Sequence, residues 1–241
     1  MHIASPFSYK AAGSAADFLD TAIKGTTEIL AGIQRVAASS VTRIILTSSF
    51  AAVGAWGMRD ERNKFYTEAD WFPVTKADVD KDLNNKTFVY LASEAFAEQA
   101  AWEAQKSSGL NESTAIIWNE FLKKRNPGGE VLAAGVPIYV DVRDIAKAHV
   151  LALDAPEAAN KQFIVTVGLA DSQTIAGVLM AEVPGAEERV PKGSPGRKSF
   201  PEDQWSASNR KAKELLGLEF HIAEETFRDT GRQLLELEKI L

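Results

Sequence analysis

The chain has 241 residues, 45% of them hydrophobic and 25% charged, a composition typical of a soluble globular protein with one large α/β domain or two small ones. Its 27 Lys and Arg residues are scattered and are outnumbered by 33 Asp and Glu residues, and the net charge of −6 argues against a nucleic-acid partner. The lack of cysteine excludes disulfides, thiolate nucleophiles and thiolate metal ligands, and the three histidines are widely spaced, so we predict no metal site.

The N-terminal residues resemble no targeting signal. They have neither the charged region nor the apolar region of a secretory signal, and no apolar run in the chain reaches the length of about 18 residues that a membrane span needs. We therefore expect an intracellular, cytoplasmic protein without a membrane partner.

A helix and a strand are predicted at the start of the chain. Apolar side chains recur at helical spacing over residues 15–38, which predicts a long amphipathic helix. The β-branched run over residues 41–49 is typical of a strand buried on both faces of a parallel sheet, and it ends in Ser48 and Ser49. Ligands of doubly wound folds bind beyond the carboxyl ends of the strands, so both serines are candidate site residues.

The rest of the chain contains further predicted helices and strands. Loops are predicted over 55–86, with room for one short helix, and over the basic stretch 184–201; helices over 87–106, 112–124, 144–153, 172–182, 208–216 and 223–241; strands over 138–142 and 162–167. We expect Asp144 to be the N-cap or a first-turn acid of its helix. The pattern indicates the α/β class.

Glycine patterns that bind phosphate do not occur in these 241 residues. Neither G-x-G-x-x-G nor G-x-x-x-x-G-K-[ST] is present. Residues 193–199 come nearest, but their spacing and Pro195 prevent the turn that aims backbone N–H groups at phosphate. We interpret this stretch as a basic surface loop.

Several motifs in order along the chain carry a family resemblance. The chain resembles the extended short-chain dehydrogenase/reductases, specifically the fungal ketone and aldehyde reductases similar to dihydroflavonol 4-reductase. The matching segments are 2–6, which looks like the end of the fourth Rossmann strand, 43–53 ("RVVLTSS.AAV"), 67–71 ("TE.DW"), 90–102 ("Y.ASK..AE.AAW"), 139–150 ("YVDVRD.A.AHV") and 209–217 ("N.KAKELLG").

This resemblance implies an incomplete Rossmann-like, doubly wound parallel sheet with a small C-terminal α/β part on the substrate side. Residues 1–109 would be the remnant of the Rossmann domain and residues 110–241 the substrate-side part, either separate or merged into one domain. The family chain begins with roughly 70 to 80 more residues, which carry the first strands and the glycine-rich turn. After Gly109 the family also has a sixth strand that this sequence lacks, so the expected chain is truncated.

The resemblance also implies an NADPH-dependent reductase of a small carbonyl compound. In the family a tyrosine gives a proton to the carbonyl oxygen, a serine holds that oxygen, and a lysine four residues after the tyrosine lowers its pKa. The serine position is Ser49, the tyrosine position is Tyr90, and the lysine position holds Glu94. Ala4, Ser5 and Ser48 would contact NADP. A carboxylate one turn from a phenol disfavours the phenolate, so we expect impaired reduction.

Two other functions remain open on the sequence alone. One is a cofactor-free isomerase or cyclase that uses Glu94 as base with Tyr90 or Ser49 as acid, and the other is a non-catalytic pseudoenzyme. Without the resemblance, the serines would be strand-end residues, Tyr90 a half-buried helix residue and Glu94 a partner of lysine on a solvated face. The family neighbours of the strand over 43–47 are truncated or absent, so an exposed sheet edge would favour a homodimer, aggregation or marginal stability.

Overall fold

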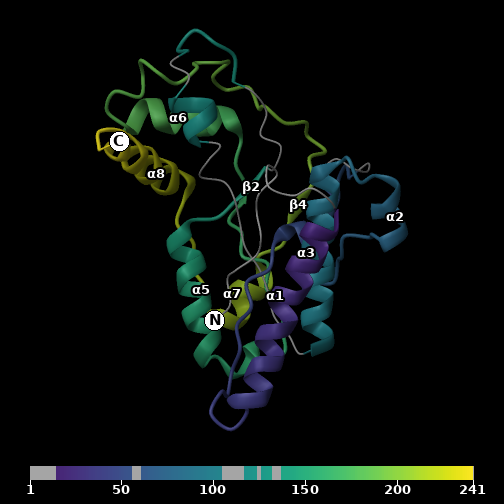
Figure 1. The fold of residues 1–241 in the computed structure, drawn as a ribbon. Coiled ribbons are helices and arrows are strands. Elements are labelled where there is room, and N and C mark those ends of the chain that lie inside the picture. The colour runs from purple at the N-terminus through teal and green to yellow at the C-terminus, as the bar shows by residue number, and fades with distance from the viewer. Residues whose placement is uncertain (1–14, 56–60, 105–116, 124–125, 132–136, 241) are drawn as a thin grey trace.

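The computed structural model describes residues 15–55, 61–104, 117–123, 126–131 and 137–240 (Figure 1). The helices are α1 (Ala15–Val36), η1 (Phe50–Ala52), α2 (Lys76–Lys81), α3 (Lys86–Ala104), the π-helix η2 (Ile117–Leu122), α5 (Val142–Asp154), η3 (Pro156–Ala158), α6 (Ser172–Glu182), α7 (Arg210–Leu216) and α8 (Ala223–Glu238). The strands are β1 (Phe65–Tyr66), β2 (Ile138–Tyr139), β3 (Gly168–Leu169) and β4 (Ser206–Ala207). Strand β1 pairs with β4 in parallel, and β2 pairs with β3 antiparallel.

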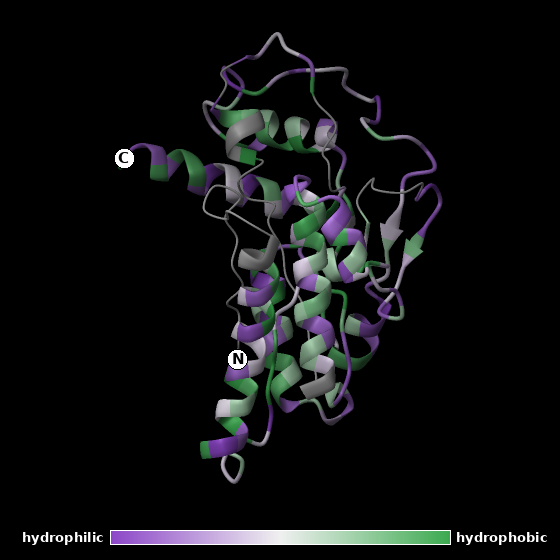
Figure 2. Cartoon of the chain, turned by 45° about the vertical axis from the view of Figure 1, so that its right-hand side comes forward, coloured by the Kyte–Doolittle hydropathy of each residue, from purple (hydrophilic) through white to green (hydrophobic). Residues whose placement is uncertain are grey.

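The predicted helices form close to their expected bounds. Helix α6 has the bounds that its sequence predicts, α3 and α7 differ by at most two residues at each end, and α1 ends two residues early. Asp141 is the N-cap of α5 and Asp144 lies in its first turn, which confirms the second of the two positions expected for Asp144. In Figure 2 the long helices carry both hydrophobic and hydrophilic residues, as amphipathic helices do. No helix in the described part of the chain is both long and apolar enough to cross a membrane.

Helices α1 and α3 pack side by side along their length (Figure 1). Ala22, Thr26 and Leu30 are buried at a spacing of four residues on α1, which places them on one face of the helix. Leu30 meets Ala101 of α3 and Leu46 in one apolar cluster. The amphipathic pattern of residues 15–36 is therefore satisfied by burial against α3 and against the segment that follows α1.

The strand predicted over residues 41–49 does not form as part of a sheet ladder. Within the described residues this segment has a single bridge, at Leu46, whereas a ladder needs a partner strand at successive positions. Its contacts nevertheless alternate as those of an extended chain do. Leu46 packs against α1 and α3, whereas Arg43 and Thr47 face α5. Helices thus cover both faces of the segment.

Two hydrogen-bonded contacts hold this segment against α5. The Arg43 guanidinium donates to the carbonyls of Ala152 and Ala155 at 2.7 and 2.6 Å. His149 Nδ1 lies 2.8 Å from the Ile145 carbonyl, which can only accept, so in the neutral ring Nε2 accepts from the Thr47 hydroxyl at 2.7 Å. His149 is therefore a hydrogen-bonded packing residue.

The other predicted strands form only in part. Strand β2 covers two residues of the expected 138–142, because α5 already begins at Val142. Residues 162–167 form no ladder within the described part, and the strand β3 follows them at Gly168. Phe163 and Ile164 are buried, so hydrophobicity identified a core segment without identifying its pairing. Of the helix predicted over 112–124, residues 117–122 form η2, and residues 112–116 lie outside the described part.

Contacts join the two parts of the chain that the sequence analysis separated at residue 109. Phe50 stacks on Trp205 with ring centroids 5.4 Å apart, and Tyr66 meets the same indole edge to face. Val53 and Ile164 belong to the same buried cluster. Whether residues 1–109 and 110–241 would fold as separate domains stays a prediction.

The Arg43 contact gives a testable expectation for stability. Arg43→Gln removes the donor from two carbonyls at the end of α5, and we expect the free energy of unfolding to fall by about 1–3 kcal/mol. Thermal denaturation measures the effect. Arg35→Gln, on the exposed end of α1, is the matched control and should leave stability unchanged. Equal stability of the two variants would show that the segment does not depend on Arg43.

Candidate active site

Ser49 lies where the extended segment ends. It has extended backbone angles, φ −133° and ψ 151°, and it is the N-cap of η1, with its side chain accepting from the Ala51 N–H at 3.1 Å. Ser49 is buried with 8% of its surface exposed. Because a hydroxyl that accepts one bond still has its own proton to donate, Ser49 keeps the capacity to hold an oxygen atom.

Tyr90 and Glu94 lie one turn apart near the start of α3. Both are buried, at 4% and 5% exposure, so the alternatives of a half-buried tyrosine and of a glutamate on a solvated face are wrong. Tyr90 packs in one cluster with Ala51 and Ala52 of η1. The fold therefore brings Tyr90 against the turn that Ser49 caps, although the two residues are 41 positions apart in the sequence.

A second acid on the same helix, Glu98, escaped the sequence analysis. Glu98 is 2% exposed; Ser48 donates to its Oε2 at 2.6 Å, and the Trp102 indole N–H donates to its Oε1 at 3.1 Å. Burial raises the pKa of the Glu98 carboxyl, and the two hydrogen bonds oppose that rise only in part. The signal was available, because Tyr90, Glu94, Glu98 and Trp102 recur every four residues and so share one face of the helix.

We call this face the α3 stripe (Tyr90, Glu94, Glu98 and Trp102). It carries two acids, and one of them, Glu94, stands at the position of the lysine that the family resemblance implies. The single basic residue of α3 is Lys86 at its first position, and both acids of the stripe are buried. Removing a carboxylate from water is unfavourable unless it is hydrogen bonded, as Glu98 is. The α3 stripe therefore offers two buried carboxyl groups to an anionic dinucleotide, a set that does not fit such a group, and the lysine of this helix, Lys86, is exposed one turn before Tyr90.

The expected cofactor contacts divide into two groups. Ser48 is buried and bound to Glu98, so its hydroxyl is already engaged within the protein. Ala4 and Ser5 lie outside the described residues. Their assignment to cofactor binding stays a prediction.

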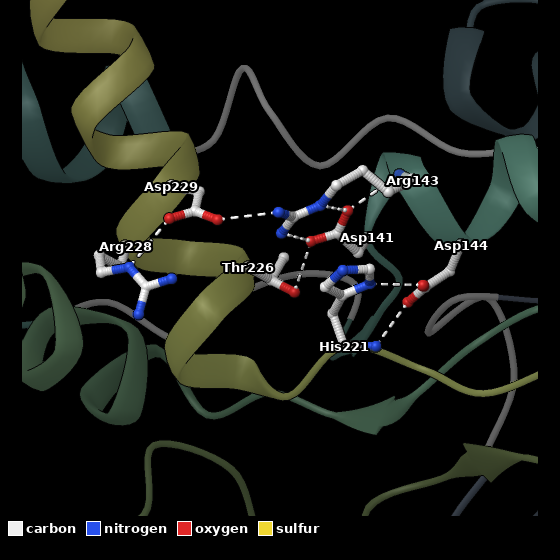
Figure 3. Close-up of polar contacts among 7 residues, drawn as sticks. All are labelled: Asp141, Arg143, Asp144, His221, Thr226, Arg228 and Asp229. Atoms are coloured by element: carbon white, nitrogen blue, oxygen red, sulfur yellow. Dashed lines mark hydrogen bonds and ion pairs between the residues drawn. The ribbon is translucent and has the colours of Figure 1, made fainter.

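A second polar cluster joins α5 to α8 (Figure 3). Asp141 accepts from the guanidinium of Arg143 at 2.6 and 2.8 Å and from the Thr226 hydroxyl at 2.9 Å. Arg143 also reaches Asp229 at 2.9 Å. Burial alone would raise the pKa of Asp141, but these bonds and the charge of Arg143 outweigh it and lower the pKa to about 2. The cluster anchors α8 to the start of α5.

Asp144 forms the other half of this anchor (Figure 3). Its side chain is 1% exposed and accepts from the backbone N–H of His221 at 2.9 Å and from its Nδ1 at 2.6 Å. Nearby, burial and the charges of Glu224, Asp144 and Asp141 raise the pKa of Tyr139 to about 12. The pair fixes the chain just before α8, and its role is structural.

Known proteins align with this chain over almost its whole length, although no protein-family model matches it. The NADPH-dependent methylglyoxal reductase GRE2 of Saccharomyces cerevisiae is 31% identical over 264 residues, covering 99% of this chain and 76% of the yeast protein. The ketoreductase azaE of Aspergillus niger is 30% identical, covering 98% of this chain and 75% of that protein. An aligned length of 264 exceeds the 241 residues here, so the alignment contains gaps within this chain.

Solved structures agree with the sequence comparison. Yeast Gre2 complexed with NADPH superimposes with a TM-score of 0.83 at 28% identity, covering 99% of this chain and 76% of that one. Gre2 of Candida albicans in complex with NADPH gives 0.82 at 27% identity, covering 98% and 76%. These matches confirm the α/β, Rossmann-like fold class. The place after Gly109 where a strand of the family is expected to be missing lies within residues 105–116, outside the described part.

The depressed pKa of Asp141 predicts a pH dependence. Asp141→Asn keeps a good N-cap for α5 but loses the charge, and at neutral pH we expect a loss of about 2 kcal/mol in the free energy of unfolding. A carboxyl with a lowered folded-state pKa stabilises above its unfolded value of about 4, and that contribution is lost as the pH falls toward about 2.

Chemical denaturation between pH 2 and pH 7 measures this difference. The two proteins should differ at pH 7 and converge at the acid end. Asp154→Asn, on the exposed last turn of α5, serves as the control and should change little. A stability difference that does not depend on pH would contradict the assignment to charge.

Proposed function

Because the chain belongs to the fungal NADPH-dependent reductases of the short-chain dehydrogenase/reductase superfamily, we propose that it descends from an enzyme that reduces a small ketone or aldehyde and that its own reductase activity is impaired. Ser49 and Tyr90 support the first half of this proposal. Their hydroxyls would hold the carbonyl oxygen and supply a proton to it. Dinucleotide, when bound by a reductase of this family, supplies the hydride.

One observation carries the second half: Glu94 is buried one helical turn after Tyr90. A lysine at this position would favour the phenolate and attract the anionic cofactor, whereas a carboxylate repels both. The position is not a surface site where water would screen the charge.

NADPH binding tests the impairment directly. We expect the 241-residue chain to bind NADPH no more tightly than the millimolar range, because its sequence contains no glycine-rich turn and the α3 stripe carries buried acids. Isothermal calorimetry measures the dissociation constant. A value in the micromolar range would contradict the expectation.

Glu94→Lys separates the effect of this residue from that of the phosphate site. If the glutamate were the sole defect, NADPH-dependent reduction of a panel of ketones and aldehydes should rise by about 10² to 10⁴ in the variant. We expect no such rescue, since a competent tyrosine cannot act unless the dinucleotide is held. Glu219→Lys, at an exposed position, controls for the added positive charge. Robust NADPH consumption by Glu94→Lys, but not by Glu219→Lys, would contradict this expectation. It would show that the chain is a reductase whose activity was limited by Glu94 alone.

A cofactor-free reaction is the second candidate, favoured by the same buried carboxylate beside a phenol. Glu94 would act as base toward a carbon next to a carbonyl, with Tyr90 or Ser49 as the acid. Proton exchange at such carbons in D2O, followed by NMR for a panel of ketones, measures this reaction. Glu94→Gln should abolish exchange and leave the fold intact. Exchange at the buffer rate with the unaltered chain, or equal exchange by the variant, would exclude this candidate and leave the non-catalytic protein.

A further inference from the structure

A pocket of about 490 Å³ opens at the far end of α3. Its walls include Trp71, Trp102 and Leu215, and its polar lining includes Glu68, Lys161 and Lys211. The volume lies within the range of small-molecule sites, which combine apolar walls with a few polar groups. Trp102 follows Tyr90 by twelve residues on one helix, which corresponds to about 18 Å along its axis. The pocket is thus separate from the Ser49 and Tyr90 site.

Internal hydrogen bonds hold one aromatic wall and the loop that carries the other. The Trp102 indole donates to Glu98, a carboxylate that is itself 2% exposed. Trp71 follows Asp70, whose Oδ2 accepts from the Thr67 backbone N–H at 2.8 Å and from its hydroxyl at 3.1 Å. Side chains and loops that are already held in place lose less conformational entropy when a ligand binds. These contacts restrict the motion of the Trp102 indole and of the loop that carries Trp71.

The charges at the pocket leave one positive charge in excess. Glu68 has a side chain 6% exposed; its Oε2 lies 3.4 Å from Lys211 Nζ, and its Oε1 accepts from the Ile164 N–H at 3.1 Å. Lys161 forms no ion pair within the described part of the chain. With Lys211 neutralised by Glu68, the ammonium of Lys161 is left to attract one negative charge. A carboxylate or sulfonate on a small ligand would provide it.

We propose that this pocket binds a small planar aromatic monoanion, with the ring between the indoles of Trp71 and Trp102 and the anionic group at Lys161. Rings pack on indole faces and edges with a preference beyond simple burial of area, which favours an aromatic over an aliphatic acid. This site requires no dinucleotide and does not depend on the proposed reductase ancestry. Its ligand is defined by shape and charge, and a neutral or cationic analogue of the same shape should bind less well.

Three naphthalene probes of similar size and different charge test the proposal. These are 2-naphthoate, 2-naphthamide and 2-naphthylmethylammonium, titrated into the unaltered 241-residue chain by calorimetry, with NMR as a check on saturation. We expect saturable binding of the naphthoate, about 3- to 10-fold tighter than the amide, and the ammonium weakest of the three. No saturable binding of naphthoate, or equal affinity for all three probes, would overturn the proposal.

Two substitutions locate the site. Lys161→Gln should remove the preference of acid over amide while leaving amide affinity unchanged, and Lys147→Gln, on an exposed position of α5, should leave the preference intact. Trp71→Leu should weaken every probe, by about 3- to 10-fold for the naphthoate. If Trp71→Leu fails to fold, Lys161→Gln decides alone, because its side chain takes part in no described ion pair. An unchanged acid preference in Lys161→Gln would show that the anion binds elsewhere.

Discussion

The candidate site depends on how the extended segment over residues 43–49 is held. Helices contact this segment on both of its faces. Arg43 and Thr47 bond to α5 on one side, while Leu46 packs against α1 and α3 and Ser48 bonds to Glu98 of α3 on the other. A chain fixed on both faces has little freedom in register, because a shift of one residue would exchange the two sets of contacts. Ser49 is placed by this register at the cap of η1.

The α3 stripe connects the two sites of the molecule. Tyr90 lies at one end against η1, Trp102 lies at the other end in the aromatic pocket, and the two buried acids lie between them. Glu98 bonds to both Ser48 and Trp102, so one buried carboxylate orients a neighbour of the candidate catalytic serine and a wall of the pocket. Such a carboxylate is tolerated in the core because both of its oxygens accept hydrogen bonds.

The helices were predictable from the sequence, and the strand pairing was not. Helical spacing is a local signal that located α6 well, and the lack of glycine and proline also located α3. A ladder depends on which segment lies alongside, which local hydrophobicity does not encode, so residues 43–47 and 162–167 were recognised as buried segments but misjudged as paired strands. Ser49 and Tyr90 came from the family motifs. Glu98 was missed because its partners Ser48 and Trp102 meet it only in the folded chain, and the pocket combines residues from four separate stretches.

Transfer of deuterium from cofactor to product tests the central claim most directly. The unaltered chain would be incubated at high concentration with NADPH deuterated at the transferable position and a panel of small ketones and aldehydes, and the alcohols would be analysed by mass spectrometry. Because a buried glutamate stands at the lysine position beside Tyr90, we expect no deuterium in any alcohol above the rate without protein. Deuterium incorporation at many turnovers per chain would contradict it and would show that a buried glutamate at this position is compatible with hydride transfer.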